Sequence, residues 1–121
     1  MATPYTIENG RRALPYLVDC AKQRMPVTYH ELGEQIGCHP RAVHHLLGYI
    51  RDDVCAPAGL PLLNALAVRR DTGLPGDRFL PGGTAHLDPE AYREAATRRQ
   101  EEVFEFPDWD DVLRSLGLRP L

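Results

Sequence analysis

Apolar residues recur with helical spacing most clearly between residues 40 and 54. They occupy positions i, i+3, i+4, i+7 and i+11, which is one face of a helix: Val43, Leu46, Leu47, Ile50 and Val54. Pro40 suits the first position of such a helix, because its missing N–H would have no partner there. The pattern therefore predicts a helix from Pro40 to about Val54 that buries this stripe and exposes its opposite side.

A shorter helix is predicted just before it. Thr28 and Glu31 have the spacing of a capping box, in which each side chain accepts a hydrogen bond from the backbone N–H of the other residue. Gly37 can adopt the left-handed conformation at which helices often end. Two helices joined by such a turn have the outline of a helix-turn-helix, whose second helix enters the major groove of DNA in known examples.

The segments on either side of this pair give weaker patterns. Residues 1 to 9 look irregular, and a supporting helix is predicted from Gly10 to Arg24, with Pro15 in or near its first turn. After the break at residues 55 to 59, alternating side chains predict a strand from about Leu63 to Arg70. Turns at residues 71 to 76 and a short strand from Arg78 to Leu80 would complete a β-hairpin. Such a hairpin is either the wing of a winged helix or a simple cover for the helices.

Two further helices are predicted at the C-terminal end. Asp88 and Pro89 are typical of a helix start, and this helix should run to about Glu105. A last helix from Trp109 to Leu116 should end at Gly117 and dock as a lid over the core, or else bind a partner protein.

The fold class expected is therefore α+β and mainly helical: a winged helix-turn-helix with a short β-hairpin wing and two extra C-terminal helices. One domain would span residues 1–121, with a core of about 10–82 and a helical extension of about 86–119.

Composition narrows the range of functions. The 121 residues are 43% apolar and carry a formal net charge of −3, which counts against an indiscriminate nucleic-acid binder. Arginines are spread over residues 11 to 78, whereas residues 101 to 111 form an acidic block, so any nucleic acid should meet the first two-thirds of the chain. Neither a signal peptide nor a membrane-spanning run is evident, so we expect a cytoplasmic protein without a membrane partner.

No catalytic centre stands out. The three cysteines lack CxxC spacing, and neither a metal site nor a cofactor motif is present, so we predict no catalytic residue, no metal and no cofactor. Cys20 should be a small core residue. Cys38 is the best-placed thiol, because a helix dipole would lower its pKa. A small enzyme that uses Cys38, or the pair His44 and His45, is therefore one alternative.

Cationic and imidazole side chains lie on the predicted exposed side of the second helix and on the hairpin. These candidate DNA-binding residues are Arg41, His44, His45 and Arg51 on the helix, and Arg69, Arg70 and Arg78 on the hairpin. The plainer alternative is that they form a solvated surface.

Several short motifs together resemble a known family. Val27-Thr28-Tyr29, Glu31-Leu32-Gly33, Arg41-Ala42-Val43 and Leu47-Gly48 are similar to the DNA-binding domain of alkylguanine-DNA alkyltransferases and the catalytically silent alkyltransferase-like proteins. The resemblance covers roughly residues 27 to 76. It implies a winged helix that binds the minor groove, with Tyr29 at the backbone beside a rotated nucleotide and Arg41 filling the gap in the base stack. A second alignment places His45, instead of Arg41, at that position.

The resemblance fails at the nucleophile. Where the alkyltransferases have Pro-Cys-His-Arg, this chain has Pro61-Leu62-Leu63-Asn64, so the alkyl-accepting cysteine is missing and dealkylation by that route is excluded. We therefore expect a non-catalytic duplex-DNA-binding protein of the alkyltransferase-like type, bacterial or phage, acting in DNA repair, modification or defence. The main alternative is a protein-interaction module of a defence or counter-defence system that docks a partner through the Trp109 helix and the acidic block.

Overall fold

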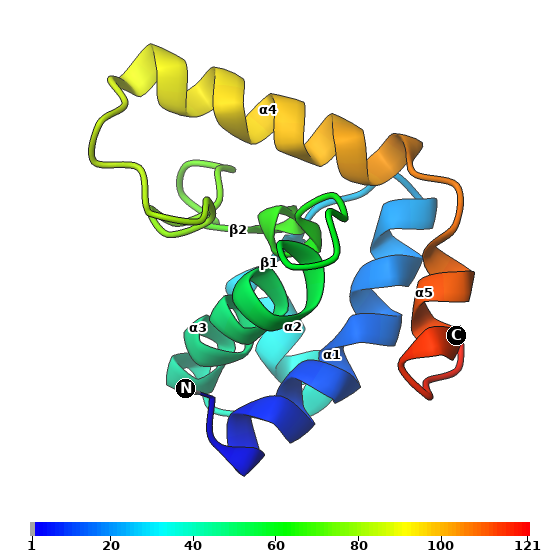
Figure 1. Cartoon of the computed structure of the whole chain (residues 1–121). Helices are drawn as coiled ribbons and strands as arrows, with labels where there is room; N and C mark the ends of the chain where they lie inside the picture. Colours follow the sequence, from blue (N-terminus) through cyan, green and yellow to red (C-terminus); the bar gives the residue numbers. More distant parts are fainter. Residues whose placement is uncertain (1) are drawn as a thin grey trace.

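The computed structural model describes residues 2–121 and is mainly helical, with a small two-stranded parallel sheet (Figure 1). The elements in chain order are α1 (Pro4–Lys22), β1 (Val27–Thr28), α2 (Tyr29–Ile36), α3 (Pro40–Tyr49), the π-helical turn η1 (Ile50–Cys55), the 3₁₀ turn η2 (Leu63–Leu66), β2 (Ala67–Val68), α4 (Pro89–Glu105) and α5 (Trp109–Ser115). No helix within residues 2–121 is long and apolar enough to cross a membrane.

The first helix is longer than predicted. Thr3 caps it by accepting a hydrogen bond from the N–H of Thr6 at 3.1 Å, and Pro4 occupies its first turn. Residues 4 to 9 are therefore helical rather than irregular, and Pro15 lies inside the helix instead of at its start. Pro15 is tolerated there because it is half-exposed, so solvent can meet the carbonyl group that it leaves without a partner.

The helix pair at the centre of the chain is confirmed. Thr28 and Glu31 form the capping box, with both hydrogen bonds at 3.1 Å. Gly37 ends α2 with a φ of +71°, a conformation that glycine adopts without steric cost. Pro40 opens α3, which continues without a break into η1 and buries the predicted apolar stripe.

The predicted hairpin wing is wrong. Residues 63 to 66 form the 3₁₀ turn η2, and the two residues of β2 pair with β1 in parallel, not with a later strand. Residues 78 to 80 are not a strand. The alternating pattern led to a wrong strand prediction because η2 lies between α1 and α4. All four of its residues are buried, whichever way their side chains point: Leu63, Asn64, Ala65 and Leu66.

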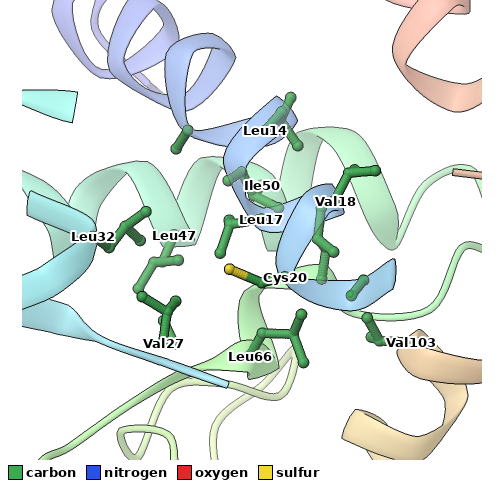
Figure 2. Close-up of a cluster of buried hydrophobic side chains, with 14 of the residues drawn as sticks. Leu14, Leu17, Val18, Cys20, Val27, Leu32, Leu47, Ile50, Leu66 and Val103 are labelled. Carbon is green, nitrogen blue, oxygen red and sulfur yellow. The ribbon is translucent and has the colours of Figure 1, made fainter. Parts of the chain in front are cut away.

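The core is built around α1. Leu14, Leu17 and Val18 of this helix are almost completely buried, and the surrounding side chains come from α2, α3, η1, η2 and both C-terminal helices. Figure 2 shows Cys20 among these apolar side chains, close to Leu17, so its expected role as a core residue is confirmed.

The C-terminal helices close the same core. Asp88 caps α4 by accepting from the N–H of Ala91 at 2.8 Å, and Gly117 follows α5 with a φ of +76°, as predicted. Trp109 is only 3% exposed and donates a hydrogen bond from its indole to the carbonyl of Val103 at 2.9 Å. Helix α5 is therefore a docked lid, on the side of α1 away from α3 (Figure 1).

Candidate functional site

A groove of about 670 Å³ lies between the exposed side of α3 and the loop of residues 69–79. Its lining combines aromatic, cationic and small residues: Tyr29, His44, His45, Leu47, Gly48, Arg51, Asn64, Arg69, Gly76, Asp77, Arg78, Phe79 and Tyr92. Six of the eight residues proposed to bind DNA are in this set. The other two, Arg41 and Arg70, are exposed and lie close in sequence to groove residues, but they do not line the groove.

Helix α3 presents its polar side to solvent. Arg41, His44 and His45 are exposed, while the apolar stripe on the other side of the helix is buried. The division follows from the 3.6-residue helical repeat, which places residues 41, 44, 45 and 48 together on one face. This face is therefore open to a partner, and the C-terminal helices do not cover it.

The loop that forms the other wall has no regular structure, yet many side chains hold its backbone. Tyr29 accepts a hydrogen bond from the N–H of Gly76 at 2.5 Å, and Tyr92 donates to the carbonyl of Pro75 at 2.7 Å. Side chains also donate to the three consecutive carbonyl groups of residues 77–79, from Thr84 to Asp77, from Arg51 to Arg78 and from Asn64 to Phe79. These anchors come from α2, η1, η2, α4 and the segment before α4, so they make the groove a preformed feature.

Tyr29 lines the groove and is bonded to its loop. Its hydroxyl is already bonded to Gly76, and its ring centroid lies 5.1 Å from that of His44. Burial raises the pKa of the Tyr29 hydroxyl, although the Gly76 N–H and the charge of Arg69 act in the opposite direction. Tyr29 therefore positions the loop and contributes the face of its ring to the groove.

Arg51 makes its hydrogen bonds within the protein. Its guanidinium group makes two hydrogen bonds to the carboxylate of Asp52, at 2.7 and 2.6 Å, and a third to the carbonyl of Arg78. Only 18% of the side chain is exposed. Since its charge is balanced by Asp52, Arg51 is better suited to joining η1 to the loop than to binding a phosphate.

The remaining arginines are more available. Arg69 pairs with Asp71 at 3.2 Å, but both side chains are more than half exposed, so solvent weakens this pair. The side chains of Arg41, Arg70 and Arg78 make no ion pair or hydrogen bond with residues 2–121.

Among the groove residues that sequence reasoning missed are Asn64, Asp77, Phe79 and Tyr92. Asn64 is 4% exposed, and its Oδ1 has no hydrogen-bond partner within the described residues, while its Nδ2 donates to Phe79. A signal was present, because Asn64 is the only polar residue in the run LPLLNALAV. A buried polar side chain is normally hydrogen-bonded, and here the bond to the loop satisfies the amide nitrogen of Asn64 but not its oxygen.

Catalytic alternatives gain little from the geometry. The pKa of the Cys38 thiol is raised, whereas we expected a helix dipole to lower it. Burial is the cause, because the side chain packs partly against the core. The charge of Arg12 lowers the pKa but does not outweigh burial. Burial also raises the pKa of Cys55 to about 11. Among residues 2–121, no three His, Cys, Asp or Glu side chains lie close enough together to hold a metal ion.

The partner-binding alternative would use the exposed side of α5 together with the acidic block. Because the Trp109 side chain is buried, a protein that docks on α5 would meet Asp111 and Arg114 instead.

No protein-family model, curated protein or solved structure matches the chain.

Proposed function

We propose that this protein binds duplex DNA without catalysing a reaction, as a helix-turn-helix protein of the alkyltransferase-like type in DNA repair, modification or defence. The observation that carries the proposal is the exposed cationic and imidazole side of α3 beside the groove. In this proposal the anchored loop of residues 69–79 takes the place of a hairpin wing.

The contacts would divide between helix and loop. Arg41, His44 and His45 project from α3, and Gly48 has no side chain to hold the nucleic acid away from the helix. Arg70 and Arg78 of the loop are free to bind phosphates of the adjoining backbone. The resemblance of Arg41-Ala42-Val43 to the alkyltransferase recognition helix supports the same orientation.

Part of the negative charge lies away from this surface. The net charge of −3 would oppose DNA if it were spread evenly. However, four of the acidic residues, Glu105, Asp108, Asp110 and Asp111, lie at the end of α4 and around α5, on the far side of α1 from α3 (Figure 1). Repulsion between DNA and this end of the molecule is therefore reduced by distance and by salt.

Arg41→Ala tests the proposal in an electrophoretic shift assay with a short duplex. Loss of one phosphate or base contact by this unpaired arginine should weaken binding about tenfold, which corresponds to about 1.4 kcal/mol. Arg98→Ala is the matched control, because Arg98 is exposed on α4 and makes no side-chain hydrogen bond within residues 2–121. A wild-type protein that retards no duplex at low salt would exclude the proposal.

A further inference from the structure

The groove has features that a DNA-binding helix does not need. A helix face binds DNA as a convex surface, whereas small molecules bind in preformed concave sites of about 300–1,000 Å³. The groove of about 670 Å³ falls within this range, and side chains from four elements fix the backbone of its loop.

The lining indicates the class of ligand. Five rings line the groove, those of Tyr29, His44, His45, Phe79 and Tyr92, and such surfaces favour a flat ring. Arg69 and Arg78 supply guanidinium groups, which match phosphate oxygens in geometry and charge. Asp77 also lines the groove and repels a phosphate placed against it, but its carboxylate can accept hydrogen bonds from sugar hydroxyls.

Asn64 adds a second, independent observation. Its Oδ1 is buried without a hydrogen-bond partner, although the residue lines the groove. A buried acceptor without a partner is costly, so a ligand that brings an N–H group to this oxygen gains more than an ordinary surface contact. Because Oδ1 is closed off from solvent, the donor reaches it only when a neighbouring side chain of the lining rotates, while the anchored loop backbone keeps its place.

We propose that the groove is a binding site for a free nucleoside monophosphate, with an N–H donor of the base on Asn64 and the phosphate at Arg69 and Arg78. This ligand class combines the three required features, a flat ring, an N–H donor and a phosphate. The inference goes beyond DNA binding, since it adds a small-molecule ligand to the same surface. A bound nucleotide would occupy space beside His44 and His45 and so compete with duplex.

Titration calorimetry with AMP, GMP, CMP and UMP tests the proposal directly. We expect at least one to bind with a Kd of about 1 mM or tighter, and Arg78→Ala to weaken that binding about tenfold while Arg98→Ala leaves it unchanged. Gly48→Leu should abolish binding by filling the groove, with thermal unfolding used to show that this variant is folded. In NMR spectra of the wild-type protein, the side-chain amide signals of Asn64 should shift on titration.

A matched ligand isolates the Asn64 contact. Purine riboside 5′-monophosphate lacks the amino group of AMP, so if AMP binds, the analogue should bind about tenfold more weakly. Equal binding of the two, or binding of none of the four nucleotides, would overturn the proposal. Binding of single-stranded DNA alone would overturn it as well, because the ligand would then be a base within a strand. The nucleotide titrations contain no DNA, so a negative result there is distinguishable from a negative result in the duplex shift assay.

Discussion

At the scale of single residues, one glycine of α1 and one of α3 have opposite surroundings. A Cβ at Gly10 of α1 would overlap the ring of Tyr49, whereas a Cβ at Gly48 of α3 would have Arg51 as its nearest neighbour at 3.7 Å. Gly10 therefore allows α1 and α3 to approach closely, and Gly48 only leaves room at the groove.

The two alanine variants should change stability in opposite directions. Gly48→Ala should stabilise the fold by about 0.5–1 kcal/mol, because alanine is the better helix former and no contact opposes it. Gly10→Ala gains the same helical preference but meets Tyr49, and overpacking of about 1–3 kcal/mol should exceed that gain. Urea unfolding of both variants measures the difference, and a more stable Gly10→Ala protein would show that the α1–α3 contact is looser than described.

Individual side chains also show where the sequence was informative and where it was not. Exposure of Arg41, His44 and His45 follows from helical periodicity, which is a local property. Asp52 directly follows Arg51, but the bond from Arg51 to the Arg78 carbonyl depends on a residue 27 positions away, which no local pattern reveals. The same is true of Tyr29 and Gly76, which are 47 positions apart.

At the scale of elements, the capping box of α2 links helix stability to pH. The N–H of Thr28 donates to the Glu31 carboxylate, and this hydrogen bond, together with the Thr28 hydroxyl, lowers the pKa of this group from its ordinary value. A group whose pKa is lowered in the folded state stabilises the fold above its unfolded pKa, which is about 4.3 for Glu, and this contribution is lost as the pH falls through the folded value.

Replacing the cap tests this link. Thr28→Ala should destabilise the protein by about 1 kcal/mol at neutral pH, because the N–H of Glu31 loses its acceptor. Glu31→Gln should remove part of the decrease in stability below about pH 4.3. Thermal unfolding of both variants from neutral to acid pH provides the measurement, and an unchanged pH profile for Glu31→Gln would place the acid sensitivity at other carboxylates.

Elements with local end signals were predictable, and elements that depend on neighbours were not. Helix ends are set by the backbone of Pro40, Gly37 and Gly117 and by the side-chain cap of Asp88, so α2, α3, α4 and α5 followed from the sequence. The segment from Leu63 to Val68 is buried on all sides between distant helices, and its two-residue strand pairs with Val27 and Thr28. Parallel pairing over such a separation leaves no signal in an alternating pattern.

At the scale of the whole molecule, α1 separates two surfaces of different character. Arg41, His44 and His45 lie on α3 on one side of α1, and the acidic residues around α5 lie on the other (Figure 1). This arrangement keeps one acidic cluster away from α3, while Asp52, Asp71 and Asp77 balance part of the arginine charge at the groove. It also predicts that affinity for DNA is limited and strongly salt-dependent, since few cations are engaged and no excess positive charge supports them.

The most direct test of the central claim is to map a short duplex onto the protein by NMR of its backbone amides at low salt. We predict that signals of α3 and of residues 69–79 shift on titration, while those of α5 stay unchanged. An absence of shifts, or shifts confined to α4 and α5, would contradict the claim that the α3 side and its groove form the nucleic-acid interface.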